Sequence, residues 1–208
     1  MTRAARYPIP ARVHRVEETI QRSRFLTTLA HAPDPEAAHA FVGAVRAEFP
    51  DATHHCWAFV AGPPGSTTRI GMSDDGEPHG TAGRPMLTAL LHAEVGEVVA
   101  VCTRWYGGVK LGTGGLSRAY SGGVVHALEG LPTVERVERV PIDVTVGYPE
   151  LDALQRLIDE EALPILEEDF GAEVRYRLGV PREEVEALER RISDLTRGAG
   201  RVERAEPE

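Results

Sequence analysis

Lysine is nearly absent from this sequence of 208 residues, and long apolar runs and cysteine-rich motifs are missing altogether. No apolar run is long enough to span a bilayer, and residues 1–12 lack the apolar core of a signal peptide. The two cysteines, Cys56 and Cys102, form no disulfide framework and no CxxC metal motif. We therefore expect a cytoplasmic protein with no membrane partner, in which both cysteines are buried as small apolar residues.

The negative charge is concentrated at one end of the chain. The formal net charge is −9, and all but one unit of it arises in residues 136–208. All eight histidines and the single lysine, Lys110, precede residue 136. An acidic whole-chain charge therefore does not exclude an anionic partner for the first part of the chain.

The first part of the chain has the pattern of mixed strands and helices. We expect strands at 13–19, 24–30, 54–61, 67–72 and 98–103, and helices at 34–49, 84–92 and 116–128. Phe41, Val45 and Phe49 recur at helical spacing and are the expected buried stripe of the first helix. Gly122 and Gly123 lie inside the last helix, which indicates a close contact between that helix and a sheet.

From about Pro132 the sequence changes to Arg- and Glu-rich β segments without glycine loops. We place a domain boundary there, which gives domains 1–132 and 133–208 and an α+β fold class. The second domain has the order β-α-β-β-α-β, which is the ferredoxin-like pattern. Its expected strands and helices, in chain order, are 137–146, 149–161, 164–170, 173–180, 182–197 and 200–204.

The most informative stretch is 98–125, VVAVCTRWYGGVKLGTGGLSRAYSGGVV, in which glycines alternate with cations. A glycine-rich turn that enters a helix exposes N–H groups and the positive end of the helix dipole, and both favour anions. We therefore predict a nucleic-acid or anion-binding site at Arg84, Arg104, Lys110, Gly112, Gly114, Gly115 and Arg118. Three aromatic residues flank the cations and are candidates for stacking on bases: Trp105, Tyr106 and Tyr120.

A polar loop over residues 73–85 carries three carboxylates, Asp74, Asp75 and Glu77. In one interpretation they face the cations across a mixed-charge groove. In the other they accept hydrogen bonds from loop N–H groups or pair with arginines. A metal site with His79 is a weaker alternative, because the spacing is not that of a metal motif. The sequence thus predicts no metal and no cofactor, and it assigns no catalytic residue.

Two motifs resemble the hallmarks of a known family. Residues 75–85, DGEPHGTAGRP, resemble the first hallmark of the IMPACT family, and residues 104–120, RWYGGVKLGTGGLSRAY, resemble the second. The chain is identified as a member of its bacterial, YigZ-like branch, with Trp105 where the family more often has Tyr. The resemblance implies an N-terminal domain similar to domain 2 of ribosomal protein S5 and to domain IV of elongation factor G, and a ferredoxin-like C-terminal domain.

Both of these relatives work on the ribosome, so the resemblance implies a translation-linked regulatory protein that contacts RNA or the ribosome, although fold alone does not establish function. We expect binding rather than catalysis. Two alternatives stay open: an enzyme that acts on a phosphorylated small molecule through Asp74, Asp75 and Glu77, and a protein-interaction module that uses the same loops. The sequence names neither the ligand nor the oligomeric state.

Overall fold

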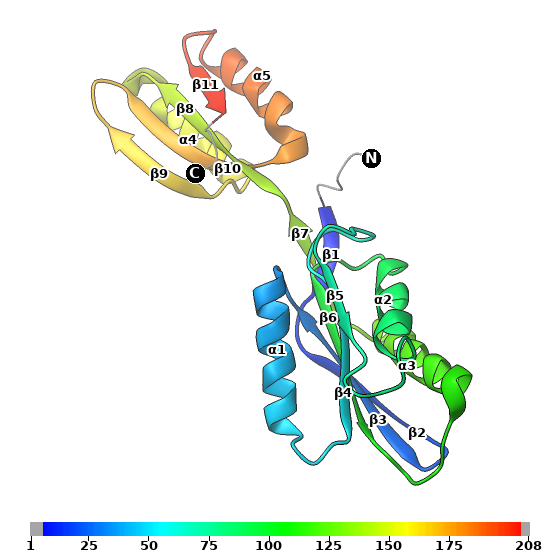
Figure 1. The fold of residues 1–208 in the computed structure, drawn as a ribbon. Helices are drawn as coiled ribbons and strands as arrows, with labels where there is room; N and C mark the ends of the chain where they lie inside the picture. Colours follow the sequence, from blue (N-terminus) through cyan, green and yellow to red (C-terminus); the bar gives the residue numbers. More distant parts are fainter. Residues whose placement is uncertain (1–5, 205–208) are drawn as a thin grey trace. The chain divides into compact units, whose positions relative to one another are not determined.

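The computed structural model describes residues 6–204 and has an α+β architecture (Figure 1). The chain divides into two compact units, Met1–Arg136 and Val137–Glu208. The sequence places the boundary at Pro132 instead. The difference arises because strand β7 (Thr133–Val137) pairs with strand β1 (Arg6–Pro10), so the residues just after Pro132 belong with the first unit. No helix within residues 6–204 is long and apolar enough to cross a bilayer.

A five-stranded antiparallel sheet forms the centre of the first unit, in the order β2-β3-β6-β4-β5. The strands are β2 (His14–Ile20), β3 (Ser23–His31), β4 (His54–Val60), β5 (Ile70–Ser73) and β6 (Val98–Trp105). Strand β4 runs antiparallel to both of its neighbours, β5 and β6. Strands β5 and β6 therefore end at the same edge of the sheet, and β4 begins there.

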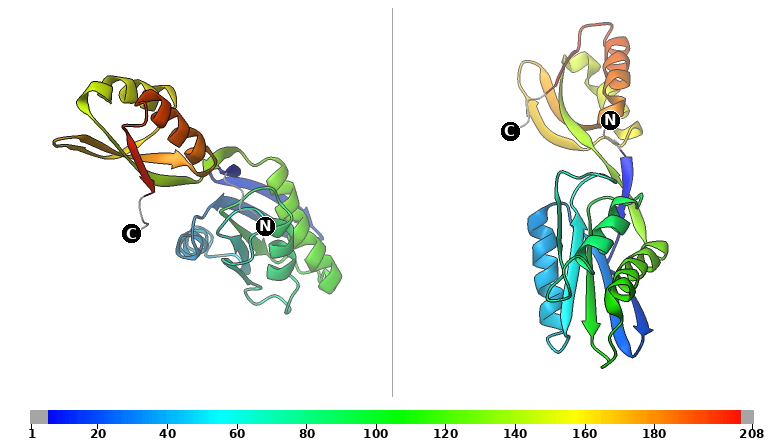
Figure 2. Two further views of the ribbon diagram at one scale, coloured as in Figure 1. Left: turned by 90° about the horizontal axis from the view of Figure 1, so that it is seen from above. Right: turned by 45° about the vertical axis from the view of Figure 1, so that its right-hand side comes forward.

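Helices cover both faces of this sheet. Helix α1 (Pro35–Glu48) packs on one face, and helices α2 (Gly83–Leu91) and α3 (Gly112–Glu129) pack on the other (Figures 1 and 2). Cys56 and Cys102 are cross-strand neighbours between β4 and β6 on the face that α2 and α3 cover. Both are free and fully buried, as expected, and burial raises the pKa of the Cys102 thiol to about 12.

The first and third helices each differ from the expectation in one respect. In α1 the buried residues are Ala38, Val42 and Val45, whereas Phe41 and Phe49 are only partly buried at the margin of the apolar cluster. Helix α3 begins at Gly112 rather than at Leu116. Its first turn is rich in glycine, whose low helix propensity hides a helix start from sequence patterns.

The two adjacent glycines within α3 have different environments. A Cβ atom at Gly123 would lie 2.6 Å from Thr27 Oγ1 on β3, while nothing lies within 4 Å of a Cβ atom at Gly122. The close helix-to-sheet contact that the sequence indicates is therefore present at Gly123 and absent at Gly122.

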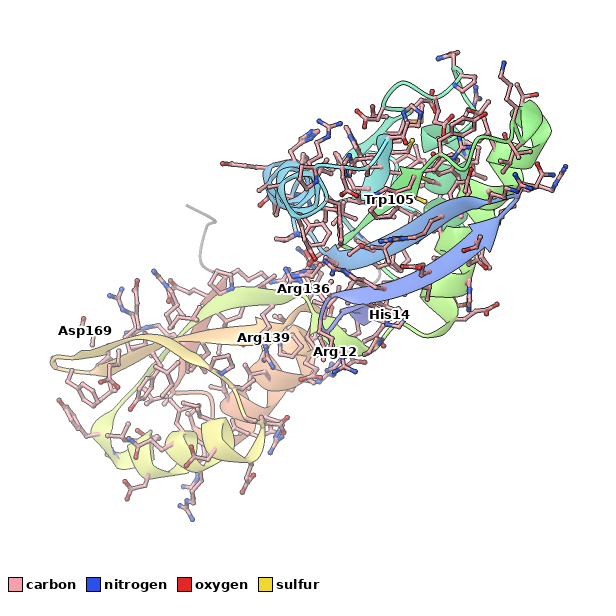
Figure 3. All side chains as sticks on the ribbon, turned by 90° about the horizontal axis from the view of Figure 1, so that it is seen from below. Arg12, His14, Trp105, Arg136, Arg139 and Asp169 are labelled. Atoms are coloured by element: carbon pink, nitrogen blue, oxygen red, sulfur yellow. The ribbon has the colours of Figure 1, made fainter. Side chains whose placement is uncertain are left out.

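The second unit is a four-stranded antiparallel sheet in the order β11-β8-β10-β9, with two helices around a common apolar core. Its elements are β8 (Arg139–Val146), α4 (Leu151–Glu160), β9 (Ile165–Phe170), β10 (Val174–Pro181), α5 (Val185–Leu195) and β11 (Arg201–Arg204). This is the β-α-β-β-α-β order that the sequence predicts. Strand β9 is an edge strand in which every residue is exposed, and Asp169 lies near the tip of its hairpin with β10 (Figure 3).

Candidate functional site

The two loops that the sequence singles out meet at one end of the five-stranded sheet. The acidic loop (74–82) follows β5 and the glycine-rich loop (106–111) follows β6, and these strands end at the same edge. Together with Thr53 and His54 at the start of β4, the loops line a cavity of about 450 Å³. Glu77 comes to this cavity from the acidic loop and Lys110 from the glycine-rich loop, so the two loops form one site.

A buried ion pair between Glu77 and Arg104 forms part of the cavity wall. The side chains are only 4% and 5% exposed. Glu77 Oε1 accepts hydrogen bonds from Arg104 Nη1 and, at 2.7 Å, from the Tyr120 hydroxyl, and Arg104 Nη2 donates to Ser23 Oγ at 3.1 Å. Within residues 6–204 neither Glu77 Oε2 nor Arg104 Nε has a hydrogen-bond partner. The ion pair is therefore only partly satisfied by the protein.

Two residues predicted for the binding surface, Arg104 and Tyr120, are buried. Arg104 follows Cys102 by two positions on β6, so its side chain lies on the face that the helices cover. Tyr120 continues the buried stripe of α3 between Leu116 and Val124, and burial raises the pKa of its hydroxyl. The interpretation of Tyr120 as a stacking surface is therefore wrong, and Arg104 is engaged by Glu77 rather than free to meet phosphates on the surface.

Asp74 organises the acidic loop and does not line the cavity. Its Oδ1 accepts hydrogen bonds from the N–H groups of Ala82 at 3.0 Å and Gly83 at 2.8 Å, and its Oδ2 accepts one from Gly80 at 2.7 Å. Ala82 and Gly83 stand at the start of α2, so Asp74 caps that helix from the preceding loop. The carboxylate is thus already satisfied by backbone.

Asp75 joins the acidic loop to other elements. Its Oδ2 accepts a hydrogen bond from the His55 N–H at 2.7 Å, its Oδ1 pairs with Arg46 of α1, and its carbonyl oxygen is 2.8 Å from His54 Nδ1. For Asp74 and Asp75 the interpretation as loop ligands describes the structure, and the mixed-charge groove retains only Glu77 from the acidic side.

Removing the Asp74 carboxylate is expected to have a pH-dependent cost. Partial burial raises the pKa of Asp74. The hydrogen bonds from Gly80, Gly83 and Ala82 together lower this pKa by more than burial raises it, so the net shift is downward. The stabilisation is therefore complete above the unfolded pKa of about 4 and is lost as the pH falls through the folded pKa. Asp74→Ala should lower the free energy of unfolding by about 1–2 kcal/mol at pH 7.

Urea unfolding between pH 7 and pH 2 checks this expectation. Tryptophan fluorescence reports the first unit alone, because Trp57 and Trp105 both lie in it. The difference between wild type and Asp74→Ala should shrink below about pH 4. A difference that stays constant down to pH 2 would show that the charge of Asp74 is irrelevant to the cap.

The remaining predicted cations, Arg84, Lys110 and Arg118, are exposed and make no ion pair within residues 6–204. Lys110 lines the cavity, while Arg84 and Arg118 line a second hollow of about 360 Å³ between α2 and α3, together with Ser117 and Ser121. The two hollows flank the first turns of α3. These three cations are therefore available to an anionic ligand.

Arg22 is a further exposed cation near this end of the sheet, and no sequence motif indicates it. It lies in the turn between β2 and β3, where its φ of +68° belongs to the left-handed region. A Cβ atom at Gly107 would overlap the Arg22 carbonyl group, so the glycine-rich loop lies directly against this turn. In the sequence, only Gly107 could have indicated this contact, because a glycine permits close approach of another backbone segment. It does not tell which segment approaches.

The N-terminus of α3 is open. Gly112 begins the helix with a φ of +73°, and the N-cap residue Leu111 makes no side-chain capping hydrogen bond. Nothing lies within 4 Å of a Cβ atom at Gly112, whereas a Cβ atom at Gly115 would lie 3.0 Å from Leu111 Cβ. The first-turn N–H groups of α3 therefore have no side-chain cap and are accessible to an anion.

Of the three aromatic residues, Tyr106 alone lines the cavity. It is 46% exposed, and its ring centroid lies 5.4 Å from the guanidinium of Arg104. Trp105, labelled in Figure 3, packs instead under Arg24, which lies 3.8 Å from its ring centroid, and its Nε1 donates to Asp51 at 2.9 Å. Tyr106 is thus the ring best placed to stack on a ligand.

The structure shows no gathered metal ligands in the part of the chain that it describes. No group of three or more His, Cys, Asp or Glu side chains is placed to hold an ion among residues 6–204. The reason is local: Asp74, Asp75 and Glu77 have different partners, and His79 is fully exposed.

The fold and the site together define a two-unit α+β protein with a loop-lined cavity at one sheet edge of its first unit. Residues 21–128 match the Impact N-terminal domain, and residues 144–199 match a domain of unknown function, DUF1949. The chain belongs to the IMPACT family, which confirms the resemblance of residues 75–85 and 104–120.

Relatives cover nearly the whole chain. The chain is 45% identical over 191 residues to IMPACT family member YigZ of Escherichia coli (strain K12), covering 92% of this chain and 94% of that protein. It is 32% identical over 190 residues to IMPACT family member YvyE of Bacillus subtilis (strain 168), covering 91% and 87%. A crystal structure described as that of a hypothetical protein matches 98% of this chain and 99% of its own, with 43% identity and a TM-score of 0.74.

Proposed function

We propose that this protein is a translation-linked regulatory protein whose first unit binds RNA, free or within the ribosome. The observation that carries the proposal is the group of exposed cations without ion pairs, Arg84, Lys110 and Arg118, around the uncapped start of α3. Phosphates favour such a place, because side-chain charge and the helix dipole have the same sign there.

The predicted likenesses of the two units support the link with translation. An N-terminal domain similar to domain 2 of ribosomal protein S5 and a ferredoxin-like C-terminal domain would relate both units to proteins that work on the ribosome. This support is analogy and adds to the geometry of the site rather than replacing it.

In this proposal each part of the site has one role. Arg84, Lys110 and Arg118 meet backbone phosphates, Gly112 and Gly114 leave room for the strand beside the start of α3, and Tyr106 offers a stacking ring. Arg104 serves as an internal group that holds Glu77 in place.

Binding of a single-stranded RNA of about 12 nucleotides over a salt series tests the proposal. Lys110→Ala and Arg118→Ala should each weaken binding several-fold and lower the slope of log K against log salt by about 0.7, because each removes one phosphate contact. Arg190→Ala is the matched control, since it removes an exposed charge from α5 in the second unit.

The proposal fails if both variants keep the affinity and the salt slope of the wild type. If RNA binding is found, sedimentation with ribosomes, with and without nuclease, distinguishes binding to free RNA from binding to RNA within the ribosome. Capture of a protein from ribosome-free lysate, without RNA binding, would favour a protein-interaction module instead.

A further inference from the structure

The lining of the cavity between the two loops combines two kinds of group. One is the cation Lys110 together with the uncapped first turn of α3, from Gly112 to Thr113. The other is the buried ion pair of Glu77 and Arg104. A ligand that fills the space must therefore carry an anionic group for the first and a hydrogen-bonding group for the second.

The charge of the cavity favours an anion. Glu77 and Arg104 neutralise each other, Asp74 accepts hydrogen bonds within the loop, and Asp75 is bound by His55 of β4 and Arg46 of α1. Lys110 has no ion pair within residues 6–204, so its charge and the dipole of α3 are left unbalanced. A phosphate is the group that a compact ammonium and helix N–H groups bind together.

The ion pair offers a ligand one specific contact. Glu77 Oε1 takes the hydrogen bonds from both Arg104 and Tyr120, so Glu77 Oε2 remains an acceptor. Arg104 Nε also lacks a partner in the described residues, but it is buried beneath the cavity surface and out of a ligand's reach. A ligand group with an N–H or O–H donor would satisfy Glu77 Oε2.

The Tyr106 side chain gives the cavity a lining that suits a flat ring. Tyr106 lines the cavity with a ring that is 46% exposed, and its partner Arg104 lies 5.4 Å from the ring centroid. The volume of about 450 Å³ is within the range of pockets for small organic ligands. A flat ring, an N–H donor on its edge and a phosphate occur together in a nucleotide.

We propose that this cavity binds a single nucleotide. The base stacks on Tyr106, an N–H group of its edge donates to Glu77 Oε2, and its phosphate meets Lys110 and the first turn of α3. The nucleotide is either a free nucleoside monophosphate or one residue of an RNA strand, and in the second case the inference rests on the proposed function. Arg84 and Arg118 lie outside this cavity and would contact only a longer strand.

Calorimetry with the full chain and the four nucleoside 5′-monophosphates AMP, CMP, GMP and UMP tests the inference. At least one should bind, and inorganic phosphate and the matching nucleoside should each bind at least about tenfold more weakly, because each makes only part of the contacts. Tyr106→Ala and Lys110→Ala should each weaken nucleotide binding about tenfold or more. Arg190→Ala, which removes an exposed charge from α5 of the second unit, is the matched control and should leave nucleotide binding unchanged. Thermal melting of each variant checks that it is folded.

Two results would overturn the inference: no binding of any of the four nucleotides at about 1 mM, or wild-type affinity in both cavity variants. Competition with the 12-nucleotide RNA then identifies the source of the nucleotide. Displacement of the nucleotide by RNA supports a residue of a strand, and binding of the nucleotide without RNA binding supports a free nucleotide. The latter result would contradict the proposed function and leave this inference intact.

Discussion

Glu77→Ala is expected to lower the free energy of unfolding of the first unit by about 3–5 kcal/mol, because it leaves a buried charge without its partner. The Arg104 side chain is only 5% exposed and has no other carboxylate within ion-pair distance among residues 6–204. The Tyr120 hydroxyl would lose its acceptor as well. Urea unfolding followed by tryptophan fluorescence measures the loss, since both tryptophans lie in the first unit.

Glu17→Ala is the matched control for this experiment. Glu17 pairs with Arg24 at 3.4 Å on the same sheet, but the two side chains are 51% and 45% exposed. A surface pair of this kind contributes about 0–1 kcal/mol. A loss below about 1 kcal/mol for Glu77→Ala, equal to that of the control, would mean that water reaches Arg104 and that the ion pair is not a buried element.

Gly107→Ala is expected to have the second large effect, a loss of about 3 kcal/mol, at the upper end of the range for overpacking. The added methyl group would overlap the Arg22 carbonyl and lie 2.6 Å from the Ser23 nitrogen. These are backbone atoms, so no side-chain rotation relieves the overlap. The turn between β2 and β3 must move away from the glycine-rich loop. Unfolding followed by tryptophan fluorescence measures this loss too.

Gly114→Ala is the matched control from the same glycine-rich segment. A Cβ atom there meets only Arg118 Nη1, at 3.6 Å, and Gly114 lies in the first turn of α3. Because alanine favours helices, the variant should be unchanged or stabilised by up to about 1 kcal/mol. Equal losses for Gly107→Ala and Gly114→Ala would contradict a specific contact between the loop and the turn at Arg22.

Local patterns predicted the elements but not every buried face. The expected strand over residues 98–103 makes up most of β6, and the β-α-β-β-α-β order of the second unit follows from its alternating segments. The sequence pattern did not predict the start of α3 at Gly112, because glycine is a poor helix former and tertiary contacts determine where this helix begins. Phe41 and Phe49 matched a helical period, but Ala38 and Val42 are the more buried residues.

The sequence predicted which loops contain the site but not the role of each residue in them. The sequence indicated both loops of the site, because each precedes a helix, but it left open whether they meet, and the structure shows that both line one cavity. It could not assign Asp74 and Asp75, whose partners depend on how the loop folds back on α2, β4 and α1. The sequence also could not show that Tyr106 is on the surface and Tyr120 in the core. The burial of Tyr120 depends on which side of α3 faces the sheet.

The fully exposed edge strand β9 bears on the association of one molecule of this protein with another. Apolar Ile165, Leu166 and Phe170 flank three consecutive acids, Glu167, Glu168 and Asp169, on an edge that no other strand covers among residues 6–204. Charged side chains on an uncovered edge disfavour its pairing with the same edge of a second molecule. The three acids of β9 therefore stand where they oppose edge-to-edge association of two copies of this chain.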